Sequence, residues 1–171
     1  MPPPARAARI SVVASLALKG LVTPTGQPFT QAYRDRILGA ANGRFDSGPA
    51  TLALTAVAQT APERELDALH ALQHARYVEG RDNADPAVIA DVLCSLGLQA
   101  AAAVLHEPHD ALRAALLERV ASARATMQLL GAQGVPQLAV AGQGGALRLV
   151  RGDALLGPRE ALLARVQTAA A

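Results

Sequence analysis

The sequence predicts an α/β domain that carries a block of inserted helices. An apolar segment at residues 10–18 has the mixture of Ile, Val, Ser, Ala and Leu that is typical of a buried strand. Helical signals then dominate up to residue 105, and the C-terminal part contains a long amphipathic helix, a glycine-linked hairpin and a final helix. With 171 residues, of which 51% are hydrophobic, the chain is long enough to bury the core of one domain.

The N-terminal apolar segment, ISVVASLAL, follows Arg6 and Arg9 and therefore also resembles the apolar part of a secretion signal. Lys19 comes directly after it, however, and no small-x-small cleavage site precedes the next element. We therefore expect a strand at residues 10–18 and a cytoplasmic protein. No apolar run reaches the roughly 18–20 residues that are needed to span a bilayer.

Proline, aspartate and glycine mark the ends of the helices in the middle of the chain. We expect helices at residues 28–40, 48–60, 62–79, 86–97 and 99–105, which together form a helical insertion over residues 28–105. Asp46 or Ser47 and Asp85 have the positions of N-terminal caps, and Gly80 and Gly97 end the helices that precede them.

A long helix is predicted for residues 109–130. Its apolar residues recur every three or four positions and share one face: Leu112, Leu116, Val120, Ala123, Met127 and Leu130. Such a face lies on a flat surface, and a hairpin of residues 137–141 and 146–150 around the turn GQGG can supply one. A final helix at residues 160–168 is expected to pack Leu162, Leu163 and Val166 on the same hairpin.

Composition argues against several classes of function. The chain has two Phe, two Tyr and no Trp, its net charge is +2, and it has no cluster of basic residues, so nucleic-acid binding is not indicated. The turn GQGG is followed neither by a helix nor by Lys-Ser/Thr, as a phosphate-binding loop would be. No serine elbow of the hydrolase type is present, and no cofactor is expected.

The histidines do not predict a metal site. His70 and His74 are one helical turn apart, a spacing that can chelate zinc, but the glutamate of a metalloprotease helix is missing. We expect half-buried, hydrogen-bonded side chains for this pair, with His70 on the apolar side of its helix. His106 and His109 flank the start of the long helix and are interpreted as surface or capping residues.

Cys94 is the only cysteine, so an internal disulfide and a dithiol redox centre are both impossible within these 171 residues. It lies inside the predicted helix 86–97, and we expect a buried, unreactive thiol. No residue of the chain is therefore predicted to be catalytic.

Pro136 begins an apolar strand in the stretch LLGAQGVPQLAV, although proline donates no backbone hydrogen bond. The part GAQGVPQLAV resembles the cis-proline loop of the DsbA-like thioredoxin superfamily. Residues 25–57 and 69–98 are similar to the helical insertion of bacterial DsbA-family proteins, and the most specific pieces are YVEGRD (residues 77–82) and GVP (residues 134–136). The resemblance covers roughly residues 25–165 and extends to protein-disulfide isomerases, 2-hydroxychromene-2-carboxylate isomerases and kappa-class glutathione transferases.

This resemblance implies a thioredoxin-like fold in which residues 10–18 and 109–168 form the thioredoxin-like part. It also implies that Gly134, Val135 and Pro136 form a substrate-binding loop, where a cis Val135–Pro136 bond leaves backbone groups free for an extended peptide. An ordinary trans proline in a helix-to-strand turn is the alternative.

The family's first strand, its first helix and the Cys-x-x-Cys between them have no counterpart in the chain; some branches have a serine there. Strands 10–18 and 137–141 would then flank an empty slot with unpaired backbone groups. Three alternatives remain open: the native product starts further upstream, the two strands close up, or another chain fills the slot, as a homodimer could.

The leading hypothesis is a DsbA-family thiol–disulfide oxidoreductase-like protein that acts on peptide or protein thiols and disulfides and is redox-inactive as these 171 residues. A non-catalytic peptide- or protein-binding thioredoxin-like module is the first alternative. An isomerase relative that binds glutathione or an aromatic acid is the second.

Overall fold

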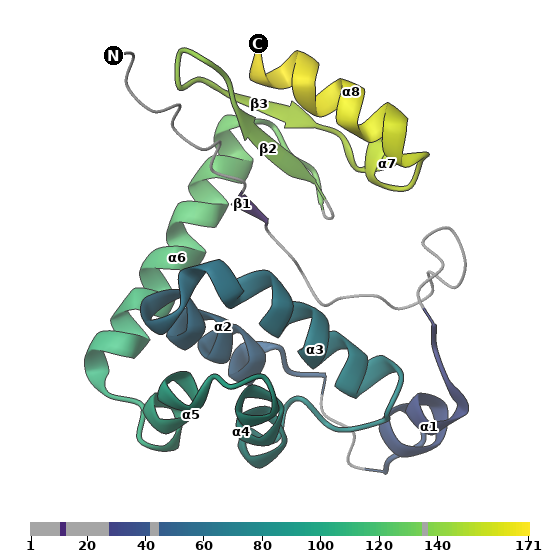
Figure 1. Ribbon diagram of the computed structural model, residues 1–171, viewed down its shortest axis with the longest axis vertical. Coiled ribbons are helices and arrows are strands. Elements are labelled where there is room, and N and C mark those ends of the chain that lie inside the picture. Colours follow the sequence, from purple (N-terminus) through teal and green to yellow (C-terminus); the bar gives the residue numbers. More distant parts are fainter. Residues whose placement is uncertain (1–10, 13–27, 42–44, 135–136) are drawn as a thin grey trace. The chain divides into compact units, whose positions relative to one another are not determined.

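The computed structural model describes residues 11–12, 28–41, 45–134 and 137–171 (Figure 1). The chain divides into two compact units, which are treated separately below. Residues 26–120 form the helical unit, and residues 1–25 together with 121–171 form the hairpin unit. None of the described helices combines the length and the apolar character that crossing a membrane requires.

The helical unit confirms the predicted block of helices. It contains α1 (Gln31–Tyr33), the π-turn η1 (Arg34–Leu38), α2 (Gly48–Thr60), the 3-10 turn η2 (Pro62–Arg64), α3 (Glu65–Tyr77), α4 (Pro86–Ser95), α5 (Gln99–His106) and the first part of α6 (Asp110–Leu129). The first helix begins at Gln31 and not at Pro28, because the Thr30 hydroxyl accepts a hydrogen bond from the Tyr33 N–H (3.3 Å) and caps the helix there.

Local capping also sets the starts of α2, α4 and α6. Asp46 accepts a hydrogen bond from the Gly48 N–H, and Asp85 accepts one from the Ala87 N–H, each at 2.8 Å. The His109 ring is also a cap, since its Nδ1 accepts the Leu112 N–H at 3.0 Å. These contacts confirm Asp46, Asp85 and His109 as capping residues.

Aliphatic side chains and alanines fill the core of the helical unit. Its most completely buried large side chains come from four helices: Val57, Leu72, Ile89, Leu93 and Leu112. Ala53, Ala56, Ala68 and Ala101 are fully buried as well, so the helix backbones can approach closely. On α6, Leu112 is buried and the other five residues of the predicted apolar stripe are half-buried. Packing of this stripe on the hairpin stays a prediction.

The turn after α3 passes unusually close to α1. Gly80 has a φ of 66°, and a Cβ atom at this position would lie 2.4 Å from the Ala32 carbonyl oxygen. Thr30 fixes the same approach, because its N–H donates to the Tyr77 carbonyl (3.1 Å) and its hydroxyl donates to the Val78 carbonyl (2.6 Å). Only glycine satisfies both the left-handed backbone and the missing space.

The hairpin unit contains a small antiparallel sheet of β1 (Ser11–Val12), β2 (Leu138–Ala141) and β3 (Leu147–Val150), in the order β1-β2-β3. The Gly142 N–H donates to the Ala146 carbonyl and the Gly145 N–H donates to the Gly142 carbonyl, both at 2.9 Å. With Gly145 in the left-handed region (φ 76°), this is a three-residue hairpin loop with a bulge. The predicted hairpin is confirmed.

Direct pairing of β1 with β2 answers the question of the empty slot for the described residues and leaves the alternative of a longer native product untested. Ser11 lies opposite Ala139 and Val12 lies opposite Leu138. Among the described residues, the two strands therefore close up and leave no slot between them. The rest of the predicted strand 10–18 lies outside the described residues.

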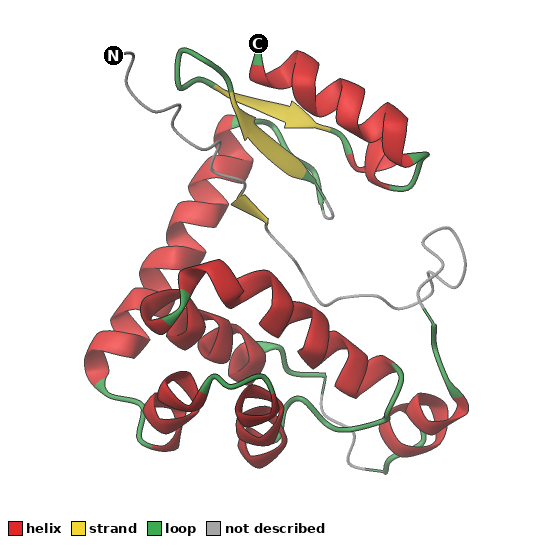
Figure 2. Ribbon diagram, viewed as in Figure 1, coloured by secondary structure: helices red, strands yellow, loops and turns green. Residues whose placement is uncertain are grey.

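Helix α8 (Arg159–Ala170) packs on the hairpin after the short helix α7 (Gly152–Leu155), which the sequence did not predict (Figure 2). The core between them consists of Val140, Val150, Ala154 and Ala169, with Leu138, Leu162, Val166 and Ala170 around it. The prediction for Leu162 and Val166 is confirmed and that for Leu163 is wrong, because Leu163 is 48% exposed. Leu162 and Val166 are four residues apart and share one face, from which Leu163 is rotated away.

Replacing Gly80 tests the close approach of α1. Gly80→Ala should lower the free energy of unfolding by about 2–5 kcal/mol, since it adds a left-handed alanine and a clash with a backbone oxygen. Gly97→Ala is the matched control: Gly97 has a φ of 77°, but no atom lies within 4 Å of the added Cβ. Gly97→Ala should lower the free energy of unfolding, measured in urea, by about 1 kcal/mol. Equal losses for the two variants would contradict the close approach.

Candidate functional site

The loop before β2 is built by an ordered helix end. The Ala132 N–H donates to the Met127 carbonyl (2.8 Å) and the Gly131 N–H donates to the Gln128 carbonyl (3.1 Å), which is the Schellman pattern that terminates α6. The chain then reaches Gly134, which is exposed, has a φ of 119°, and has no atom within 4 Å of a Cβ built on it. Backbone at this point is therefore open on the side where a side chain would stand.

Of the three predicted loop residues, the structure describes Gly134. Val135 and Pro136 lie outside the described residues, so the cis form of their peptide bond stays a prediction. The strand that the loop leads into, β2, is hydrogen-bonded to β1 on one side and to β3 on the other. Both sides of β2 are therefore occupied by described strands.

Gln137 is a candidate site residue that sequence reasoning missed. Its side-chain oxygen Oε1 is buried, and no described residue donates a hydrogen bond to it. Buried polar atoms in native proteins are nearly always paired, so this acceptor is a candidate partner for an N–H or O–H donor outside the described residues. The sequence signal was a polar side chain directly after Gly-Val-Pro and before an apolar strand.

Cys94 does not have the predicted environment. It is exposed, near the C-terminal end of α4, and the expectation of a buried thiol is wrong. The residues of α4 that turn inward are Ile89, Val92 and Leu93, and Cys94 follows them on the outer side. The thiol belongs to the helical unit and does not lie at a helix N-terminus, the position that activates family thiols.

The histidines of α3 face outward, contrary to the expectation of half-buried side chains. His70 is exposed, and α3 turns Ala68, Leu72 and Ala75 inward instead. His74 is exposed as well but does have a partner, the Glu79 carboxylate at 3.1 Å. In the part of the chain that the structure describes, no three His, Cys, Asp or Glu side chains form a cluster that could hold a metal ion.

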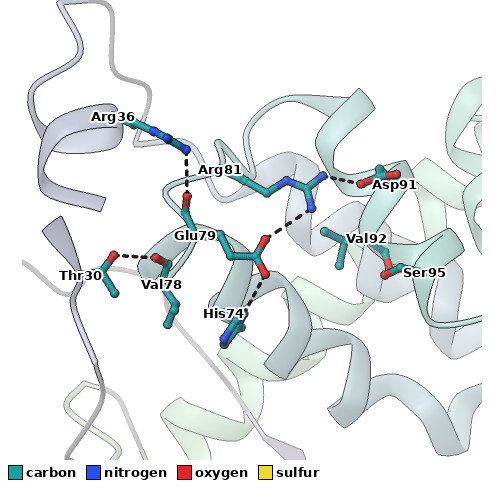
Figure 3. A network of polar contacts seen from close by, with 9 residues as sticks. All are labelled: Thr30, Arg36, His74, Val78, Glu79, Arg81, Asp91, Val92 and Ser95. Atoms are coloured by element: carbon teal, nitrogen blue, oxygen red, sulfur yellow. Dashed lines mark hydrogen bonds and ion pairs between the residues drawn. The ribbon is translucent and has the colours of Figure 1, made fainter. Parts of the chain in front are cut away.

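Residues of the YVEGRD segment (77–82) make polar contacts with several neighbouring elements of the helical unit (Figure 3). The Glu79 carboxylate lies between His74 and Arg81, and Arg81 continues to Asp91 on α4 at 2.6 Å. Arg36 donates to the Glu79 carbonyl at 3.5 Å. All these side chains are at least partly exposed, so the contacts join η1, α3 and α4 and do not enclose a reaction centre.

Arg76 is the one charged side chain that the described core buries, with 5% of its surface exposed. Its guanidinium donates to Asp82 (3.0 Å) and to Asn83 (2.8 Å), and the Phe45 ring covers it at 5.4 Å. A buried charge with these partners stabilises the turn that follows α3.

An aromatic cluster stands next to this arginine. The rings of Phe29, Tyr33 and Tyr77 contact one another with centroids 5.2–5.7 Å apart, mostly edge to face. Burial is the main cause that raises the pKa of Tyr77 above its ordinary value of 10.0; a charge on Tyr33 raises it further, and Arg76 opposes the shift. Tyr77 is therefore a neutral core phenol that joins α3 to α1.

Together, the antiparallel sheet, the covering helix α8 and the separate helical unit define an α/β protein of the thioredoxin-like class. Two solved structures of the cytosolic disulfide reductase DsbM from Pseudomonas aeruginosa, one of them with GSH, are similar to the chain. Both are 33% identical over 84% of this chain and 68% of DsbM, with TM-scores of 0.68 and 0.65.

A protein from Nitrosomonas europaea that is provisionally assigned as a protein disulfide isomerase is also similar, with 26% identity, a TM-score of 0.63, and coverage of 84% of this chain and 65% of that one. No protein-family model and no curated protein matches the chain. The chain belongs to the DsbA-like thioredoxin superfamily, within its family of thiol–disulfide oxidoreductase-like proteins.

The lack of a hydrogen-bond partner for the Gln137 side-chain oxygen can be tested through the stability of the protein. Gln137→Leu removes a buried acceptor without a described partner, so the free energy of unfolding should stay unchanged or rise by up to about 1 kcal/mol. Gln143→Leu, an exposed position in the hairpin turn, is the matched control and should change stability little. A loss of more than about 1 kcal/mol in Gln137→Leu would show that the oxygen is paired within the protein.

The raised pKa of Tyr77 predicts that the folded protein loses stability in alkali. Because its pKa is raised in the folded state, folding favours the neutral phenol, and the stability contributed below pH 10.0 is lost as the pH rises through the raised pKa. Tyr77→Phe should therefore lose less unfolding free energy above pH 10.0 than the parent chain. Tyr33→Phe keeps the burial of Tyr77 and should retain most of the loss. Identical alkaline profiles for parent and Tyr77→Phe would contradict the assignment.

Proposed function

We propose that this chain is a cytoplasmic DsbA-family thiol–disulfide oxidoreductase-like protein whose loop Gly134–Val135–Pro136 holds the extended backbone of a thiol or disulfide substrate. The observation that carries the proposal is the buried Gln137 oxygen without a described partner, next to the open backbone at Gly134. The names of the similar proteins, a cytosolic disulfide reductase and a protein disulfide isomerase, support the substrate class and the compartment.

In the proposed complex, a cis Val135–Pro136 bond turns backbone groups of the loop outward. These groups pair with the substrate as a short antiparallel strand would, since an extended peptide gains affinity from main-chain hydrogen bonds. Gln137 accepts a further N–H from the substrate, which removes the cost of leaving its oxygen unpaired. Recognition of this kind reads the backbone and tolerates many substrate sequences.

We also propose that the 171 residues have no dithiol activity. Disulfide exchange needs a thiolate that attacks one sulfur of the substrate, which releases the other sulfur as a thiolate, and a second thiol that resolves the mixed disulfide. These 171 residues contain one cysteine, so a second thiol must come from outside them. Cys94 also belongs to the helical unit, whereas the proposed binding loop belongs to the hairpin unit.

A peptide-binding module without catalysis is the second candidate, because the open loop and Gln137 support binding as well as they support chemistry. Glutathione is the small thiol to test first, since one of the similar DsbM structures was solved with it. Oxidised glutathione and an extended cysteine-containing peptide therefore serve as the two probes.

The redox proposal is tested by disulfide reduction with this chain and with Cys94→Ala. We expect no reduction of a protein disulfide above the glutathione background for either protein. Reduction at a rate that survives Cys94→Ala would contradict the proposal, because no thiol would then remain in the chain.

Binding is tested by calorimetric titration with the two probes. Gln137→Leu should weaken binding of at least one probe about fivefold, the effect of one hydrogen bond of about 1 kcal/mol, whereas Gln143→Leu should leave it unchanged. Equal affinities in the parent and Gln137→Leu would contradict the role of Gln137. Binding without reduction would favour the non-catalytic module.

A further inference from the structure

Arg151 stands at the end of the sheet where the chain leads from Gly134 into β2. It follows β3 directly, and Leu138 of β2 pairs with Val150 of β3. The next position of this antiparallel register sets Arg151 opposite Gln137. Arg151 has an extended backbone (φ −65°, ψ 151°), so the strand geometry continues through it. The hairpin therefore makes Arg151 a neighbour of the candidate site.

The side chains of Arg151 and Gln137 belong to one face of the sheet. Val150 and its partner across the ladder, Leu138, pack with α8. Because side chains alternate between the two faces along a strand, the adjoining residues Arg151 and Gln137 are directed to the face opposite α8. An exposed guanidinium is thus brought beside the side chain whose oxygen has no described partner.

The Arg151 guanidinium is not engaged by the described part of the fold. Among the residues whose positions are described, it forms no hydrogen bond and no ion pair. The other arginine of this hairpin, Arg148, differs, because it donates to the carbonyls of Thr168 (3.4 Å) and Ala169 (3.3 Å) at the end of α8. Arg148 therefore holds the helix, whereas the donors of Arg151 are open to a ligand.

Positive charge dominates around this face. Residues 121–134 and 137–171 contain two carboxylate side chains, Asp153 and Glu160, against five arginines, which are Arg124, Arg148, Arg151, Arg159 and Arg165. Asp153 is already paired with Arg165 at 3.7 Å. A surface with this balance attracts an anionic partner and repels a cationic one.

We propose that Arg151 is a specificity-determining residue that pairs with a carboxylate of an extended peptide substrate, so that the site selects acidic peptides. The inference rests on the proposed function and names its substrate class. Gln137 and the loop before it bind the peptide backbone, and Arg151 adds recognition of one side chain. A guanidinium can bind a carboxylate through two parallel N–H donors, which favours arginine over lysine in this role.

Calorimetric titration of the full chain tests the preference. The probes are three versions of one extended cysteine-containing peptide that differ in a flanking residue, which is Glu, Gln or Lys. We expect the Glu peptide to bind about fivefold more tightly than the Gln peptide, and the Lys peptide to bind most weakly.

Substitutions assign the preference to the residue. Arg151→Gln should bind the Glu and Gln peptides equally and keep the parent affinity for the Gln peptide, whereas Arg151→Lys should retain part of the preference. Arg124→Gln is the matched control, since it removes the same charge from an exposed position on α6, and it should retain the full preference. Circular dichroism checks that each variant is folded.

The outcomes separate the inference from the proposed function. Equal affinity of the parent chain for the three peptides would overturn the inference and leave backbone binding in place. A preference for the Glu peptide that survives in Arg151→Gln, or that Arg124→Gln removes as completely, would also overturn it. Binding of none of the peptides would contradict the proposed function itself, and the inference with it.

Discussion

Hydrogen bonding on both sides of β2 is the constraint on which the hairpin unit depends. Because β1 and β3 occupy its two edges, β2 is the central strand, and a one-residue slip would turn every side chain to the other face. The observed register places Val140 in the core with α8, and Gly134 lies in the segment that leads into this central strand. The position of the candidate site follows from it.

A second constraint organises the helical unit. The segment YVEGRD turns at Gly80, where a Cβ atom would clash with the backbone of α1, and the same turn carries Asp82, the partly exposed partner of the buried Arg76. This segment was among the most specific pieces of the family resemblance, and its contacts are those of a structural junction. Sequence similarity in this segment therefore reports on the fold of the helical unit more than on a reaction.

Most of the fold could be predicted because its signals are local. Asp46 and Asp85 precede prolines at helix starts, and the glycines of GQGG form the hairpin turn, so neither depends on distant residues. Burial depends on distant residues, and there the predictions for His70, Cys94 and Leu163 were wrong. Each stands in a helix whose apolar residues are spread over more than one face, and tertiary packing selected another face for burial. Gln137 was missed for a related reason, since an unpaired oxygen is recognised only when its surroundings are known.

The proposed binding loop requires a cis bond between Val135 and Pro136, and the geometry of this peptide bond is the most direct test. Nuclear Overhauser effects between the two residues distinguish the isomers: a contact between the two Hα protons requires cis, and a contact from the Val135 Hα to the Pro136 Hδ protons requires trans. We expect the Hα–Hα contact in the folded chain. A folded chain that gives the Hα–Hδ contact alone would contradict the proposed binding loop.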